Sequence, residues 1–357
     1  MSGTSGTVLD RIRRTAQLHP RRLVLAEGDD DRVVRAADRL SRDKLADVTL
    51  LGARETVRAT ARRAEAALLG VRVEDAGDPA EIERTTAALR AARGERLSAD
   101  DAARHARDPL FQAAARVREG RADCFVAGAS RTTADVLRAA LWLIGTAPGV
   151  STVSSFFLMV VPPSSAAPNE RVFLFADCGV VPDPTPAQLA EIGCLAADSL
   201  ERLTGEVPHT AFLSFSTRGS AEHPRVHKIR EALTLAQKRR PDRHFDGELQ
   251  LDAAVDPNVA RKKAPGSAVA GHANVLIFPD LDAGNIGYKL VQRLGGAAAY
   301  GPILMGLARQ ANDLSRGCSA DDVVEVSTIA CALSVAPSPA GAEGRVQTAA
   351  PRPGPGR

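Results

Sequence analysis

Short apolar runs that alternate with longer amphipathic stretches constrain the fold of this sequence more than any other feature. The runs occupy residues 23–26, 48–51, 124–127, 156–161, 172–175, 211–215, 275–278 and 303–305. Helical periodicity follows several of them, as at residues 32–42 and 133–144. Strand-then-helix repetition predicts an α/β fold with mainly parallel sheets and helices on both faces. Ligands in such folds bind in loops beyond the carboxyl ends of the strands.

Length and charge narrow the class of protein further. The 357 residues exceed what one compact core usually holds, so we expect two domains. A net charge of +3 does not favour nucleic acid or a membrane surface as partner. No apolar stretch is long enough to cross a bilayer and no secretory pattern opens the chain, which predicts a cytoplasmic protein. Residues 337–357 are rich in Pro, Gly and Ala, and we expect a disordered tail there.

Several familiar sites are not indicated. No G-x-G-x-x-G follows a strand and no G-x-x-x-x-G-K-[ST] occurs, so neither a dinucleotide fingerprint nor a P-loop is supported. No metal-ligand spacing such as H-E-x-x-H is present. The five cysteines lack C-x-x-C spacing, which predicts reduced thiols and neither a disulfide framework nor a zinc site.

Two segments carry residues suited to anions. In GNIGYK at residues 284–289, two glycines at a strand-to-helix junction can present backbone N–H groups to a phosphate, with Lys289 adding charge; a plain tight turn is the alternative. In NDLSRGCSADD at residues 312–322, Arg316 has the planar fork that suits phosphate. Ser319 and Asp322 have the spacing of a capping box, and on spacing alone a cap is the commoner role for Asp322.

Longer motifs, taken together, resemble the phosphate acetyl/butyryl transferase family over about residues 21–335. In chain order they are EGDDDRVVRAA at 27–37, GASRTTADVLR at 128–138, VSSFFLM at 153–159, ADCGVVPDPT at 176–185, FDGELQ at 245–250, KKAPGS at 262–267, PDLDAGNIGYK at 279–289 and NDLSRGCS at 312–319. The resemblance implies two α/β/α domains like those of isocitrate and isopropylmalate dehydrogenases, with a cleft between them, in a homodimer. Domain I would comprise residues 1–150 plus 300–336, and an inserted domain II residues 151–299.

The same resemblance implies reversible transfer of an acetyl group between coenzyme A and inorganic phosphate, with acetyl phosphate as the other substrate. No tightly bound cofactor and no metal are implied. Ser315 and Arg316 match the pair that holds the acyl phosphate, and Asp322 matches the catalytic base. The expected substrate-binding residues are Arg138 and Arg90 for coenzyme A, with Arg131, Thr132, Thr133, Asn285, Gly287, Tyr288 and Lys289.

One position departs from the family pattern G-A-x-H-[ST]-T, because Arg131 replaces the histidine. If that histidine only hydrogen-bonds phosphate, arginine can substitute for it. If it transfers a proton, arginine cannot, because its pKa stays above about 12.

Four alternatives stay open at this point. The acyl group can be propionyl or butyryl, or the chain can be an inactive homologue that only binds coenzyme A or acyl phosphates. Cys318 can carry the acetyl group covalently. The aspartates of EGDDD, DPDP and PDLD can hold a divalent ion in a dehydrogenase of the same fold.

Overall fold

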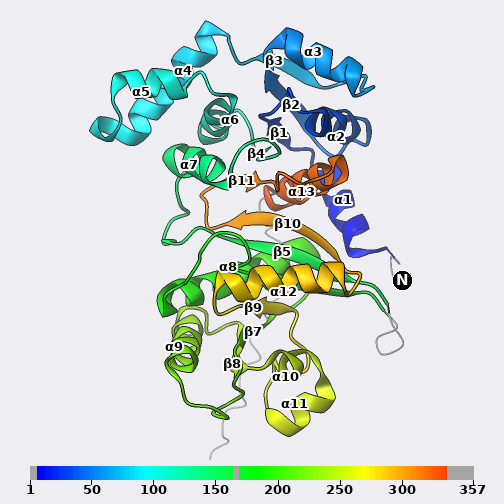
Figure 1. Cartoon of the computed structure of the whole chain (residues 1–357), viewed down its shortest axis with the longest axis vertical. Coiled ribbons are helices and arrows are strands. Elements are labelled where there is room, and N and C mark those ends of the chain that lie inside the picture. Colours follow the sequence, from blue (N-terminus) through cyan, green and yellow to red (C-terminus); the bar gives the residue numbers. More distant parts are fainter. Residues whose placement is uncertain (1–5, 164–168, 336–357) are drawn as a thin grey trace, which may run out of the picture.

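The computed structural model describes residues 6–163 and 169–335, arranged around two β-sheets (Figure 1). The first sheet contains β1 (Arg22–Leu25), β2 (Asp47–Gly52), β3 (Arg72–Asp75), β4 (Cys124–Ala127) and β11 (Gln310–Asp313). Its order is β11-β4-β1-β2-β3 and every pairing in it is parallel. The helices around it are α1 (Val8–Leu18), α2 (Asp31–Arg42), α3 (Arg54–Arg63), α4 (Pro79–Arg93), α5 (Ala99–His105), α6 (Pro109–Arg118), α7 (Thr133–Leu143) and α13 (Ala320–Leu333), with a short 3-10 turn, η1, at Gly94–Arg96.

Alternating side chains of β1 explain why helices cover both faces of this sheet. Leu23 and Leu25 pack in one cluster with residues of α1, α2 and α13. Val24 points to the other face and packs with residues of α4, α6 and α7. A strand buries both of its faces only when helices lie on each side, so the continuous apolar run predicted this three-layer arrangement.

The second sheet has the order β10-β5-β6-β9-β7-β8. Its strands are β5 (Ser154–Val161), β6 (Arg171–Ala176), β7 (His209–Leu213), β8 (His244–Leu249), β9 (Val275–Ile277) and β10 (Ala298–Met305). The pairings from β6 to β8 are parallel, whereas β5 runs antiparallel to both β6 and β10. The accompanying helices are α8 (Pro186–Thr204), α9 (Pro224–Arg239), α10 (Leu251–Val255), α11 (Pro257–Lys263) and α12 (Leu281–Arg293). The prediction of an α/β fold with mainly parallel sheets is confirmed.

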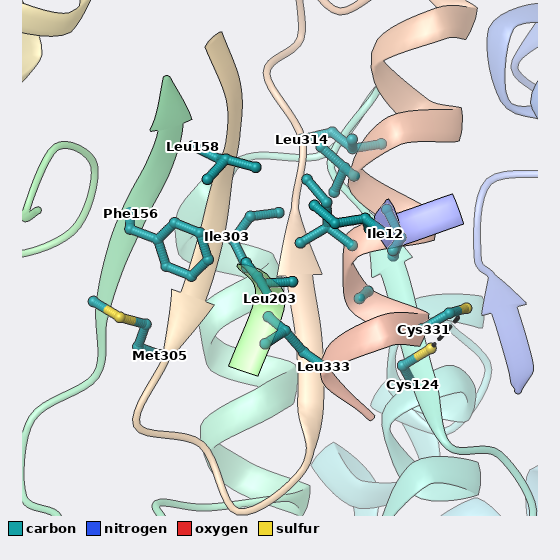
Figure 2. Packing of buried hydrophobic residues seen from close by; sticks show 14 of the residues in the cluster. Ile12, Cys124, Phe156, Leu158, Leu203, Ile303, Met305, Leu314, Cys331 and Leu333 are labelled. Atoms are coloured by element: carbon teal, nitrogen blue, oxygen red, sulfur yellow. Dashed lines mark hydrogen bonds between the residues drawn. The ribbon is translucent and has the colours of Figure 1, made fainter. Parts of the chain in front are cut away.

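One hydrophobic cluster runs through both sheets. It joins Ile12 of α1 and Leu333 of α13 to Phe156 of β5, Ile303 of β10 and Leu203 of α8 (Figure 2). The side chains of Phe156 and Ile303 are fully buried. The two sheets are therefore held together by a shared core as well as by the chain that connects them.

The chain passes between the sheets twice, after α7 and after β10, and the two passages lie side by side. The amide of Ala147 donates to the carbonyl of Gly306 at 2.9 Å, and the amide of Ala308 donates to that of Gly145 at 3.0 Å. Residues 300–305, which the expected limits assign to domain I, hydrogen-bond to β5 within the second sheet. The domain limits themselves stay a prediction.

The expectations about membrane spans, metal sites and the C-terminal tail can be compared with the described residues only. Within residues 6–163 and 169–335, no helix is long and apolar enough to span a membrane. The same residues contain no group of three or more His, Cys, Asp or Glu side chains placed to hold a metal ion. The tail expected at 337–357 lies outside the described residues.

Candidate active site

A cavity of about 640 Å³ lies between the two sheets, where loops and strands of both contribute to its walls. The first sheet supplies the loops that follow β4 and β11, and the second supplies β5, β10, the loop after β6, and α12. The residues expected at the site that line this cavity are Arg131, Thr133, Asn285, Tyr288, Lys289, Ser315, Arg316 and Asp322. Its size is within the range of small-molecule sites.

The start of α13 brings Asp322 to the cavity. Ser319 is the N-cap, and its hydroxyl accepts from the amide of Asp322 at 3.1 Å. In return, Asp322 Oδ2 accepts from the amide of Ser319 at 2.8 Å and from its hydroxyl at 2.9 Å. The capping box anticipated from the spacing is thus present. It uses one carboxylate oxygen of a residue that also lines the cavity.

Ser315 and Arg316 lie on the loop between β11 and α13. The Ser315 hydroxyl accepts from the amide of Gly317 at 3.2 Å, and its carbonyl accepts from the amide of Cys318 at 2.9 Å, which folds the loop into a turn. The residue Arg316 is exposed and its side chain reaches the cavity wall. Such an arginine can receive an anion from solvent.

The loop after β4 is held from beneath by Glu27, a buried residue of the EGDDD turn. One of its oxygens accepts from the amides of Gly128 and Ala129, both at 2.9 Å. The other accepts from the amides of Ser130 and Arg131, at 2.8 and 3.0 Å, and from the Ser130 hydroxyl. The EGDDD motif indicated this turn but gave no role for Glu27. The carboxylate satisfies four amides that would otherwise be unpaired.

Next along the chain, Arg131 and Thr132 have different surroundings. The Arg131 guanidinium pairs with Asp108 at 3.1 Å and lines the cavity. Thr132 is the N-cap of α7, where its hydroxyl accepts from the amide of Asp135 at 3.2 Å. Thr132 does not line the cavity, and the role its position indicates is that of a helix cap.

Asp313 is a cavity residue that sequence analysis missed. It ends β11 with 1% exposure, and its carboxylate accepts from the Thr133 hydroxyl at 2.6 Å. Burial raises the pKa of Asp313 to about 7, and the nearby negative charge of Glu27 adds to the effect. A polar pair, Asn-Asp, at the carboxyl end of a buried strand was the signal that could have indicated it.

Helix α12 presents one face to the cavity. Asn285, Tyr288 and Lys289 line it as expected, and so do Gln292 and Arg293, which sequence analysis did not select. These positions follow the i, i+3, i+4, i+7 and i+8 spacing of a single helix face, a signal that was available in the sequence. Lys289 donates to Asn285 Oδ1 at 2.8 Å.

The expectation that GNIGYK forms a strand-to-helix junction is wrong. Helix α12 begins at Leu281, after the N-cap Asp280, so both glycines lie inside it. The amide of Gly284 donates to the carbonyl of Asp280 at 3.2 Å and is not open to a phosphate. A Cβ at Gly284 would approach the Asp177 carbonyl oxygen to 2.2 Å, and one at Gly287 would meet the Phe278 ring at 3.0 Å. The glycines therefore allow the helix to pack closely against its neighbours.

The two arginines expected to bind coenzyme A lie outside the cavity lining. Arg138, on α7, pairs with Asp135 at 2.9 Å and its side chain is 44% exposed. Arg90 is an exposed residue in the last turn of α4. Both arginines lie on helices of the first sheet, α4 and α7, whose apolar residues pack in one cluster.

Cys318 is a poor nucleophile in this setting. The residue is buried, and burial raises the pKa of its thiol to about 11 despite the nearby charge of Arg32. A thiol with such a pKa is almost entirely protonated at neutral pH. Cys318 also lines the cavity, and the raised pKa of its thiol is the observation that disfavours a covalent acetyl-cysteine.

Comparison with known proteins identifies the group to which this site belongs. The family model described as "Phosphate acetyl/butaryl transferase" matches residues 7–331. A phosphate acetyltransferase of Paracoccus denitrificans is 49% identical over 323 residues, which cover 90% of this chain and 97% of the relative. One of Acetivibrio thermocellus is 46% identical over 322 residues, covering 90% and 96%.

Solved structures point to the same family. A phosphotransacetylase from Streptococcus pyogenes superposes with a TM-score of 0.85 and 40% identity, covering 94% of this chain and 99% of that one. A 4-hydroxythreonine-4-phosphate dehydrogenase from Burkholderia phymatum, at 15% identity and a TM-score of 0.52, shares the fold alone. The fold and the matches together define a transferase. The chain belongs to the phosphate acetyl/butaryl transferase family.

Proposed function

We propose that this protein is a phosphate acetyltransferase, which transfers an acetyl group reversibly between coenzyme A and inorganic phosphate. The observation that carries the proposal is that Ser315, Arg316 and Asp322 line one cavity with the cations Arg131 and Lys289. Acetyl phosphate and phosphate are small anions, and a cluster of cations around a hydroxyl and a carboxylate suits them. The names of the relatives support the same reaction.

In the proposed mechanism, the carboxylate of Asp322 removes the proton of the coenzyme A thiol. A free thiol has a pKa near 8.5, so only a few per cent is thiolate at neutral pH without such a base. Oδ2 is occupied by the cap, and Oδ1 is the oxygen we assign to the proton. The thiolate then attacks the carbonyl carbon of acetyl phosphate directly, without an enzyme-bound acetyl group.

As the new C–S bond forms, negative charge moves first to the carbonyl oxygen and then to the departing phosphate. We assign stabilisation of that charge to the guanidinium of Arg316 and the hydroxyl of Ser315. Arg131 and Lys289 would hold the phosphate, the former in place of the family's histidine. Bringing both substrates into one cavity turns a bimolecular step into an effectively unimolecular one. The reaction needs no redox cofactor and no metal.

Coenzyme A is longer than the reacting groups, and we propose that its distal phosphates extend beyond the cavity toward Arg138 and Arg90. Both arginines are exposed and lie on neighbouring helices, α7 and α4. Their absence from the cavity lining fits a contact remote from the thiol. We also propose a cytoplasmic location, because all five cysteines are free thiols, as is usual in that reducing compartment.

A homodimer is part of the proposal. Ile286, Leu290 and Leu294 form an apolar stripe on α12, with exposed fractions of 57%, 51% and 82%. A second copy of the chain covering this stripe would remove it from water. Sedimentation of the wild type and of Leu290→Asp tests this: a dimer that dissociates in the variant supports it, and a monomeric wild type rejects it.

The test of the reaction is an assay of coenzyme A acylation with acetyl, propionyl and butyryl phosphate, together with the reverse release of coenzyme A on adding phosphate. We expect turnover to be highest with the acetyl donor. Preference for butyryl phosphate would replace the proposal by a butyryltransferase. Binding without turnover for all three donors would indicate a homologue that only binds them.

A further inference from the structure

Arg32 connects the two loops that carry Arg131 and Arg316 through three hydrogen bonds of its guanidinium. It lies in the first turn of α2 and does not line the cavity. Nη1 donates to the carbonyls of Arg316 at 2.7 Å and Cys318 at 3.0 Å. Nη2 donates to the carbonyl of Ala129 at 2.7 Å. These partners are 284, 286 and 97 positions away in the sequence.

Asp30 fixes the guanidinium in this position. Its oxygens accept from Arg32 Nε at 3.0 Å and Nη2 at 2.7 Å, while the Arg32 amide donates to Oδ1 at 2.9 Å. The five N–H groups of the side chain are thus all engaged: two with the carboxylate and three with backbone carbonyls. An ammonium has three donors and no planar fork, so lysine cannot reproduce this set.

Two residues of the EGDDDR turn therefore hydrogen-bond to the loop after β4. Glu27 accepts from the amides of residues 128–131, and Arg32 donates to the carbonyl of Ala129. Of these two residues, Arg32 also donates hydrogen bonds to the loop after β11. Arg32 thus adds a link between the two loops beyond the pairing of β4 with β11 and the Thr133–Asp313 hydrogen bond, and it is bonded to the backbone of Arg316 itself.

We propose that Arg32 is a positioning residue for acetyl transfer, which holds Arg316 and Arg131 at the spacing the reacting phosphate requires. This inference rests on the proposed function. The exposed side chain of Arg316 depends on its own backbone for direction. A displacement of about 1 Å at a reacting group can cost roughly 100-fold in rate. Arg32 itself is not among the residues that line the cavity, although Arg316 and Cys318, whose carbonyls it binds, are.

The experiment compares Arg32→Lys with Arg35→Gln in the full chain. Arg35 is a matched control on the same helix, because its Nε makes one hydrogen bond, to the carbonyl of Ala64 at 3.3 Å, away from the cavity. We expect Arg32→Lys to lower kcat by about 10- to 100-fold. The KM for coenzyme A should stay within about twofold, since Arg138 and Arg90, which we propose bind its distal phosphates, are untouched. Arg35→Gln should keep the kcat of the wild type.

Two further variants and two further measurements extend the test. Asp30→Asn retains a good N-cap for α2 but weakens the hold on Arg32, so it should fold and lose part of the kcat. Hydrogen exchange of residues 128–132 and 313–319 should accelerate in both variants and not in Arg35→Gln. Free guanidinium should restore kcat to Arg32→Ala, because the residue's 28% exposed side chain leaves an accessible space.

The outcomes separate the two proposals. Wild-type protein that acylates coenzyme A, with Arg32→Lys equally active or with unchanged hydrogen exchange in the two loops, overturns the role of Arg32 alone. Wild-type protein without acylation of coenzyme A overturns the proposed function, and the role of Arg32 in that reaction with it.

Discussion

Buried carboxylates in this protein hold loops by their backbone amides. Glu27 does so for residues 128–131. Asp177 accepts from the amides of Ser155, Gly179, Val180 and Val181, and thereby shapes the loop after β6 that borders the cavity. Glu191 accepts from the amides of Ser151 and Thr152, at the passage between the sheets. In each case several N–H groups satisfy the oxygens of a buried carboxyl group.

Asp322 serves as a cap, and we propose that it is also the base; one substitution separates the two roles. Asp322→Asn keeps an oxygen for the cap, so the free energy of unfolding should change by less than about 1 kcal/mol. Turnover should fall by roughly 100-fold or more, because an amide cannot accept the thiol proton. Steady-state kinetics and urea unfolding check both. Asp321→Asn is the control, since Asp321 pairs with Arg39 and its side chain is 76% exposed. Near-normal turnover of folded Asp322→Asn would reject the base assignment.

Arg131 gives a prediction about phosphate. If its guanidinium binds the phosphate group, Arg131→His should change the KM for phosphate and acetyl phosphate, because a neutral imidazole attracts an anion less. The KM for coenzyme A should change little. Initial-rate measurements in both directions check this. Identical constants in the variant and the wild type would place Arg131 outside the phosphate site, as a partner of Asp108 only.

Asp313 makes stability depend on pH. Its folded-state pKa is raised to about 7, above the value near 3.9 of an unfolded chain. Between these values the folded state binds more protons than the unfolded state. The contribution of Asp313 to the free energy of unfolding is therefore fully present below about pH 4 and is lost as the pH rises through 7. Asp313→Asn should flatten that decline, as measured by urea unfolding at several pH values. An unchanged slope in the variant would show that Asp313 is ionised throughout.

The sequence located the residues of the site that share one motif and could not locate those that meet only through folding. Ser315, Arg316 and Asp322 are close in the chain, so a single resemblance found them together. The roles of Arg32 and Asp313 depend on contacts across sheet and loop, which no spacing encodes. Arg138 follows Thr133 by five positions, about 140° around α7, so helix geometry turns it away from the cavity that Thr133 lines.

At the scale of elements, α12 has a different use for each of its faces. Asn285, Tyr288 and Lys289 line the cavity, and Tyr288 stacks on Phe157 with ring centroids 3.9 Å apart. The apolar stripe faces solvent. The glycines lie on the side that approaches the loop after β6 and Phe278. Small movements of this helix would therefore change the cavity directly.

A substitution at Gly284 tests that connection. Gly284→Ala would place a methyl group 2.2 Å from the carbonyl oxygen of Asp177, so the helix or the loop must shift. Overpacking of this kind costs about 1–3 kcal/mol, and we expect a lower Tm together with a higher KM for the acyl phosphate. The control is Ala308→Gly, because Ala308 is exposed. Gly295→Ala is unsuitable as a control, because a Cβ at that position would lie 2.7 Å from the carbonyl oxygen of Val291. A normal Tm and KM in Gly284→Ala would show that α12 tolerates displacement.

Strand positions were predicted more successfully than strand directions or sheet edges. Apolar runs at residues 48–51 and 124–127 became β2 and β4 almost unchanged. Alternation does not reveal direction, so the antiparallel pairing of β5 was not foreseen. β3 was missed because its four residues, RVED, are half-exposed or exposed at the edge of the sheet and lack an apolar run.

For the whole molecule, the shared cluster implies cooperative unfolding. Side chains of both sheets pack in one cluster, so neither sheet can lose its core without exposing that of the other. We expect a single calorimetric transition with equal van't Hoff and calorimetric enthalpies per cooperative unit. Differential scanning calorimetry at several protein concentrations checks this and accounts for any association. Two resolved transitions would show that the sheets unfold separately.

The position of β11 at the edge of the first sheet has a consequence for synthesis on the ribosome. The strands β1 to β4 emerge early, yet their sheet is completed by β11, and α13 covers it, only after the intervening residues of the second sheet have been made. The loop that carries Arg316 joins these two late elements. A nascent or prematurely terminated chain that ends before β11 lacks both Arg316 and Asp322, so the proposed catalysis can begin only after these residues have been synthesised.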